Sequence, residues 1–113
     1  MKPARGRGAF VALAAPVLLA AGAACAEPRF THEQIEAGHR QFERTCAQCH
    51  GRNMVNSGTT VYDLRRFPVD QEERFFTSVT NGKGNMPSFK DALSPEQMQL
   101  LWAYVGSRGG KEP

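Results

Sequence analysis

Two cysteines and a histidine stand close together in the sequence as Cys46-Ala47-Gln48-Cys49-His50. In one helical turn, residues three positions apart lie on the same side, so both thiols would face one bound group. A histidine directly after the second cysteine completes the attachment pattern of a c-type haem. We therefore predict one haem c, held covalently through Cys46 and Cys49, with His50 facing the iron.

Two other kinds of chemistry use closely spaced thiols. A structural zinc site needs four ligands, commonly two such pairs, and the sequence contains no second pair. A thiol oxidoreductase, in which Cys46 and Cys49 cycle as a disulfide, would be expected within an alternating strand and helix pattern. The sequence shows no such pattern, but this alternative stays open, and the absence of a haem absorption band would favour it.

The second axial ligand of the iron must come from a separate segment. Met54 follows His50 too closely to reach across a porphyrin, and Met98 lies on the apolar stripe of a predicted helix, where methionine usually packs in a core. Met86 lies in a glycine-rich loop beside a proline, and we predict it as the ligand. Its thioether favours a raised reduction potential. Two histidines near the first predicted helix are the rivals, namely His32 and His39.

Residues 1–26 are predicted to be an export signal rather than part of the fold. Basic residues near the start precede an alanine-rich apolar run over 9–24, and a small-x-small cleavage site ends at Ala26. The run is short for a membrane span, which needs roughly 20 strongly apolar residues. Retention of the signal as a membrane anchor and lipidation of Cys25 stay open as alternatives. Export would bring the protein to the periplasm.

Residues 27–113 are few enough to predict one domain, which is too small to bury a large core of its own. A porphyrin inside it would supply apolar surface. Three of the 14 basic residues and none of the 11 acidic ones precede residue 27, which leaves 11 of each sign. This balance, without any run of basic residues, excludes nucleic acid as an expected partner. We expect a monomer without a membrane span.

Local capping signals predict the first and third main helices. The first is expected over 32–44, with Thr31 as its N-cap and Gln34 in its first turn. The third is expected to follow Ser94, with Pro95 at the first helical position and Gln97 completing a capping box. It should end near residue 106. Apolar residues recur along both segments with helical spacing, so each should bury one face.

A second main helix is predicted to begin at Asp70, where Glu73 completes a box-like pair, and to end at Asn81-Gly82. A short helix over 61–67 would precede it. Gly38 in the first helix costs about 1 kcal/mol relative to alanine. We interpret this glycine as a place where another helix crosses very close to the backbone.

From residue 27 onward, the chain resembles the class I c-type cytochromes over nearly its whole length. Four segments carry the resemblance: the attachment motif, the glycine and aromatic residue of 38–42, the loop 81–89 around Met86, and the helix 100–105, whose Tyr104 is expected to cross at Gly38. The resemblance implies an all-α fold, with three main helices and short helical turns around one low-spin haem. It also implies electron transfer rather than catalysis.

One feature usual in this family is missing. A proline shortly after the motif normally offers its carbonyl to the proximal histidine, and residues 51–67 contain no proline. Since a ligating histidine needs such an acceptor, we expect a carbonyl within 57–59. For the haem propionates, the expected partners are Tyr62, Arg65 and Arg66. The alternative is that both arginines are simply solvated.

The sequence thus predicts a periplasmic one-electron carrier with His50 and Met86 as axial ligands. Two strong-field ligands would leave no open coordination site on the iron. Partners should be redox proteins, such as a quinoprotein dehydrogenase or a terminal oxidase, that dock transiently. The alternative function is a haem-based sensor or ligand-binding protein, which would need a labile sixth ligand.

Overall fold

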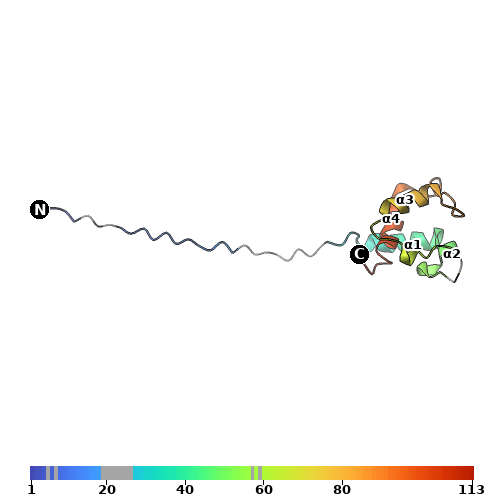
Figure 1. Ribbon diagram of the computed structural model, residues 1–113, viewed down its shortest axis with the longest axis horizontal. Coiled ribbons are helices and arrows are strands. Elements are labelled where there is room, and N and C mark those ends of the chain that lie inside the picture. The colour runs from blue at the N-terminus through green and yellow to red at the C-terminus, as the bar shows by residue number, and fades with distance from the viewer. Residues whose placement is uncertain (5, 7, 19–26, 57, 59) are drawn as a thin grey trace.

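Four α-helices and two short 3-10 helices make up the regular structure of the residues that the computed structural model describes, which are 1–4, 6, 8–18, 27–56, 58 and 60–113. The elements are α1 (His32–Thr45), α2 (Ala47–His50), η1 (Arg52–Met54), η2 (Leu64–Arg66), α3 (Glu72–Asn81) and α4 (Pro95–Gly106). Figure 1 shows α1 and α2 on one side of the domain and α3 on the other, with α4 running between them and across α1. The predicted all-α fold is confirmed.

The boundaries of α1 and α4 are set by complete capping boxes. At α1, the backbone N–H of Gln34 donates to Thr31 Oγ1 at 3.1 Å, and the Gln34 side chain accepts from the Thr31 N–H at 2.9 Å. At α4, Ser94 and Gln97 exchange the same two hydrogen bonds. Each box satisfies two N–H groups that a helix start would otherwise leave without partners. Both predicted starts are therefore confirmed.

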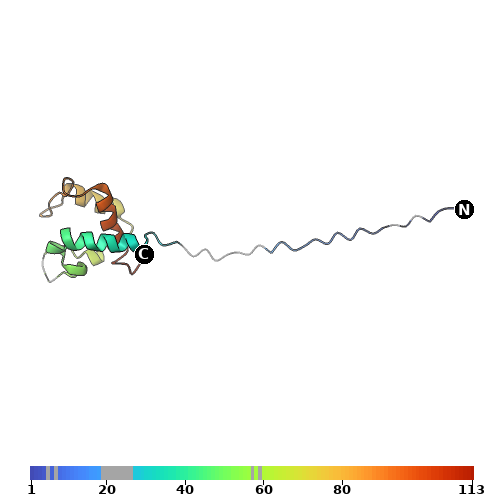
Figure 2. The same ribbon diagram turned by 180° about the vertical axis from the view of Figure 1, so that it is seen from behind.

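The helices α1 and α4 cross in contact at Gly38 (Figure 2). A Cβ atom added to Gly38 would lie 1.9 Å from the carbonyl oxygen of Leu100 and 3.0 Å from Cβ of Tyr104. Only glycine, which has no Cβ, permits this approach. The predicted crossing of Tyr104 at Gly38 is confirmed, and it sets the angle between the two sides of the domain.

The start of α3 differs from the prediction. The helix begins at Glu72, with Gln71 as its N-cap and no side-chain capping bond. The backbone N–H of Gln71 donates to the Pro68 carbonyl at 3.1 Å, so a turn occupies the residues before the helix. Asp70 lies in that turn and cannot cap, which is why the predicted Asp70 and Glu73 pair does not form. Instead of the short helix expected over 61–67, only η2 forms.

An aromatic cluster joins α3 and α4 to the segment before α3. Phe67 meets the rings of Phe75 and Trp102 edge-on, with centroids 5.9 and 6.0 Å away. The rings of Phe75 and Trp102 lie 5.1 Å apart. Such arrangements contribute about 0.5–1.5 kcal/mol per pair beyond the burial of area. The cluster fixes α3 at a distance from α1, which leaves space between the two sides of the domain.

Arg29 fastens the chain before α1 to the rest of the domain. Its guanidinium donates to the Gly106 carbonyl at 2.7 Å and to the Val69 carbonyl at 3.1 Å. The ordered domain therefore includes Arg29, close to the predicted boundary at residue 26. The described residues up to 18 extend away from the helices (Figure 1), and their apolar side chains, such as Phe10, are exposed.

The predicted cleavage site and Cys25 fall within 19–26, outside the described residues. Among the described residues, no helix combines the length and apolar character needed to cross a membrane.

Candidate functional site

The attachment motif forms one helical turn, as its spacing predicts. The backbone N–H groups of Cys49 and His50 both donate to the Cys46 carbonyl, at 3.2 and 2.9 Å. Cys46 is half-buried and Cys49 is exposed. Both side chains and His50 line one cavity of about 710 Å³. The structure therefore brings the three predicted residues together on one wall.

The His50 imidazole is oriented by a backbone carbonyl. Its Nδ1 lies 3.1 Å from the Tyr62 carbonyl oxygen. Burial lowers the pKa of His50, against a smaller opposite effect of this hydrogen bond. A neutral imidazole that donates Nδ1–H to Tyr62 has its lone pair on Nε2, the form that a metal ligand requires.

The expected acceptor was a carbonyl within 57–59, of which residues 57 and 59 lie outside the described residues. The structure places the acceptor at Tyr62 instead. Asp63, the next residue, accepts from the backbone N–H of Arg65 and starts η2. A short helical turn therefore begins just after Tyr62 and helps to hold its carbonyl. This carbonyl replaces the proline carbonyl that is usual in the family.

The thiol of Cys46 is unsuited to redox exchange. Burial, with a smaller contribution from neighbouring Cys49, raises the pKa of Cys46 to about 12. The thiolate is the nucleophile in disulfide exchange, and reactive dithiols lower the thiol pKa to form it. A cysteine that stays protonated near neutral pH therefore weighs against the alternative in which Cys46 and Cys49 cycle as a disulfide.

Met86 lines the same cavity from a tight turn after α3. Lys83 and Met86 exchange two backbone hydrogen bonds, each 3.0 Å long. Gly82 packs beneath this turn with φ +77°, and an added Cβ would lie 2.6 Å from the Met86 carbonyl oxygen. The N–H of Phe89 donates to the Val79 carbonyl at 2.9 Å, which ties the loop back to α3. The position of Met86 thus depends on local backbone bonds.

The other candidate ligands lie elsewhere. Met54 and Met98 are buried in the core, and Thr80 Oγ1 donates to the Met98 sulfur at 3.6 Å. The His39 ring stacks on Tyr104, and its Nε2 lies 2.7 Å from Asn53 Oδ1. None of these residues is among the described residues that line the cavity, and neither is His32. Met86 is the one described methionine that lines it.

The cavity has the chemistry of a site for a large flat apolar group. Aromatic and aliphatic side chains form most of its wall, namely Phe42, Leu64, Phe67, Phe75, Val79, Phe89, Leu101 and Val105. Two thiols, an imidazole and a thioether lie among them. A porphyrin needs this combination, with sulfur atoms for its vinyl groups and N and S ligands for its iron. The residues present therefore fit haem c.

The arginines predicted as propionate partners are placed differently. Arg65 donates to both carboxylate oxygens of Asp63, at 2.9 Å each. This pairing is the main reason that the pKa of Asp63 is lowered. Neither Arg65 nor Arg66 is among the described lining residues, whereas Tyr62 and Leu64 are. Arg74 and Lys83, which line the cavity, were missed because only the fold brings them there.

No group of three or more histidine, cysteine or acidic residues gathers into a metal site anywhere in the described chain.

Comparisons with known proteins agree with the geometry. A family model described as cytochrome c oxidase, cbb3-type, subunit III matches residues 33–105. A cytochrome c6 of Nostoc sp. is 40% identical over 72 residues, which are 60% of this chain and 65% of that protein.

Two further matches differ in how much of the other protein they cover. A quinohemoprotein alcohol dehydrogenase, ADH-IIG of Pseudomonas putida, is 37% identical over 66% of this chain and only 10% of its own length. This chain therefore spans less than two thirds of the Nostoc cytochrome c6 and of the dehydrogenase. The crystal structure of cytochrome c6C from Synechococcus sp. PCC 7002 matches with a TM-score of 0.52 and 31% identity, over 66% of this chain and 96% of that one.

Proposed function

Because this chain belongs to the class I c-type cytochromes and carries single electrons on one covalently bound haem c, we propose that it works in the periplasm as a diffusible shuttle between redox enzymes. The haem supplies an iron that cycles between Fe(II) and Fe(III). The observation that carries the proposal is the shared cavity, where the Cys46, Cys49 and His50 side chains of one turn meet Met86 from a separate loop.

Each side chain has a distinct task in this proposal. Cys46 and Cys49 hold the porphyrin by thioether bonds, so the carrier does not lose it while diffusing. His50 would hold the iron through Nε2, because its Nδ1–H donates a hydrogen bond to the Tyr62 carbonyl oxygen. Met86 binds the iron from the other segment and stabilises Fe(II) relative to Fe(III). With an imidazole and a thioether both available to hold the iron, the site would favour electron transfer over the binding of small ligands.

We further propose that residues 1–26 direct export and are removed. The exposure of Phe10 and Leu13, and the Arg29 contacts that begin the ordered domain, support this boundary. The intact mass of protein purified from the periplasm of a cell that matures c-type cytochromes should equal residues 27–113 plus one haem. A mass that includes the first 26 residues, or an acyl group on Cys25, would contradict the cleavage site. A mass without haem would contradict the assignment of the cavity.

The proposed electron donor is a quinoprotein dehydrogenase, and the proposed acceptor is a terminal oxidase. A segment similar to this chain makes up a tenth of a quinohemoprotein alcohol dehydrogenase. We infer that this chain serves an enzyme of that kind. The matching family model carries the name of an oxidase subunit, which supports the acceptor.

Docking to such a partner should depend only modestly on salt. Residues 27–113 carry 11 basic and 11 acidic side chains, so long-range attraction by net charge is absent. Transient redox encounters are also small, below about 1,200 Å² of buried surface. The rate of reduction by a quinoprotein alcohol dehydrogenase, followed by stopped flow from low to high salt, should change by less than about threefold. A steep fall with salt would contradict a balanced docking surface.

A further inference from the structure

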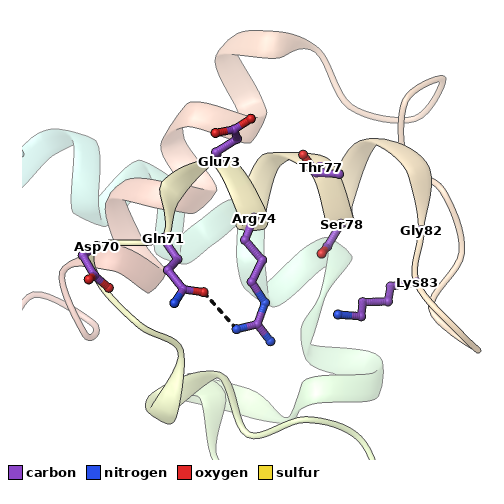
Figure 3. A pocket seen from close by; sticks show the side chains of 8 residues that line it. All are labelled: Asp70, Gln71, Glu73, Arg74, Thr77, Ser78, Gly82 and Lys83. Atoms are coloured by element: carbon purple, nitrogen blue, oxygen red, sulfur yellow. Dashed lines mark hydrogen bonds between the residues drawn. The ribbon is translucent and has the colours of Figure 1, made fainter.

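Two positively charged side chains line the cavity, and neither the attachment of a haem nor the ligation of its iron explains them. Arg74 of α3 and Lys83 of the following turn line it, and no Asp or Glu is among its described lining residues. The same two residues and Ser78 also line a shallower hollow of about 570 Å³ along α3 (Figure 3). In Figure 3, the Arg74 and Ser78 side chains leave the same side of α3, and Lys83 reaches back toward them.

Arg74 is held in position by its neighbours. Its guanidinium carbon lies 5.2 Å from the centroid of the Phe67 ring and 5.9 Å from that of Tyr62. Nη1 donates to Gln71 Oε1 at 3.1 Å. Stacking on aromatic faces orients a guanidinium without neutralising it. Most of its N–H groups therefore remain available to an acceptor in the cavity.

Neither cation forms an ion pair with a described residue, although Asp70 and Glu73 line the shallower hollow with them. In the described part of the chain, the ion pairs involve Glu43, Asp63 and Glu112, and none includes Arg74 or Lys83. Arg65 differs, because Asp63 already pairs with it. Two cations without an ion pair, at a cavity whose remaining described lining is mostly apolar and uncharged, favour a group that is apolar over most of its area and anionic at one edge. Haem has this character, since its two propionates are carboxylates.

We propose that Arg74 and Lys83 bind the haem propionates, and that Arg65 and Arg66 do not. The planar guanidinium suits a carboxylate, to which it can donate two parallel hydrogen bonds, and the Lys83 ammonium adds a second charge. The inference depends on the haem c of the family and on the cavity, and it holds whichever redox partner the protein serves.

This arrangement has a consequence for the reduction potential. A fixed positive charge near the haem disfavours Fe(III), which carries one more positive charge than Fe(II), and so raises the potential. It also keeps the propionates ionised and in place. Removal of the charge should therefore lower the potential without changing the axial ligands.

The test is the midpoint potential of five haem-loaded proteins, measured by spectroelectrochemistry. Relative to the unmodified protein, Arg74→Gln should reduce the equilibrium ratio of Fe(II) to Fe(III) about three- to tenfold, where a tenfold change equals about 59 mV. Arg74→Lys should restore most of the shift, because it keeps the charge. Arg66→Gln is the matched control: it removes the same charge from an exposed residue outside the described cavity lining, and its potential should stay unchanged.

Two further readings keep the result clear. Lys83→Gln should shift the potential in the same direction as Arg74→Gln. Because this substitution retains the backbone hydrogen bonds to Met86, it provides a second test even if Arg74→Gln fails to fold. The absorption spectrum should stay unchanged in every variant, which excludes loss of an axial ligand as the cause. The proposal would be overturned if the potential stayed unchanged in both Arg74→Gln and Lys83→Gln. It would also be overturned if Arg66→Gln shifted the potential as much as Arg74→Gln does.

Discussion

Gly38→Ala is expected to destabilise the haem-loaded protein by about 3 kcal/mol or more, the upper end of what an overpacked core costs. The new Cβ would lie 1.9 Å from the Leu100 carbonyl oxygen and 2.8 Å from its carbon, both of which are backbone atoms of α4. No side-chain rotation relieves this contact, so the two helices must separate. Separation would expose Phe42 and Leu101, which are fully buried at 0% exposure.

The sign of this prediction is informative, because alanine is the better helix former by about 1 kcal/mol. If Gly38 were merely tolerated in α1, the substitution would stabilise the protein. Urea unfolding followed by circular dichroism measures the difference. Arg40→Ala, at an exposed position of the same helix, is the control and should leave the urea midpoint nearly unchanged. A midpoint for Gly38→Ala at or above that of the unmodified protein would contradict the close crossing.

Met86→Ala is expected to abolish the weak far-red absorption band that a methionine–iron bond gives the oxidised protein. The reduction potential should also fall by about 0.1 V or more, since axial ligands set haem potentials over about 0.8 V. The physical reason is that the thioether stabilises Fe(II), and the water or other donor that replaces it does so less. Absorption spectra and redox titration of the same haem-loaded sample check both expectations.

Met98→Leu is the matched control for Met86→Ala. Met98 is buried in α4 and receives a hydrogen bond from Thr80 on its sulfur, so its replacement changes core packing and this one bond but no described residue of the cavity lining. The far-red band should survive in this variant. If the band instead survived Met86→Ala, Met86 would not be the ligand. If the unmodified protein lacked the band and bound carbon monoxide rapidly, the alternative of a haem-based sensor would be favoured.

Helix boundaries were predictable where the sequence specifies them locally. Thr31 with Gln34, and Ser94 with Gln97, form capping boxes from residues three apart, and both helices begin where these boxes predict. Gly38 was equally informative, because a glycine inside a helix has a cost that close packing explains. The start of α3 was mispredicted because the backbone turn from Pro68 to Gln71 decides it, and Asp70 falls within that turn.

The surroundings of the haem-attachment residues were less predictable. Every residue has a carbonyl, so nothing in the side chains shows that the acceptor for His50 is Tyr62. The arginines that would bind the haem propionates were equally hard to identify from the sequence. Arg65 stands near the motif in the sequence, but Asp63, two residues before it, pairs with it. Arg74 reaches the cavity only because the aromatic cluster fixes α3 there, which is a property of the assembled fold.

The contacts of Arg29 hold the chain entry against Gly106, at the end of α4. Figures 1 and 2 show both this entry and the C-terminus at the end of the domain remote from α2. A tether at either terminus, whether a lipid, an engineered tag or a fused enzyme, would thus attach away from the haem-attachment turn. A tethered molecule could therefore still present the haem-attachment turn to a proposed redox partner.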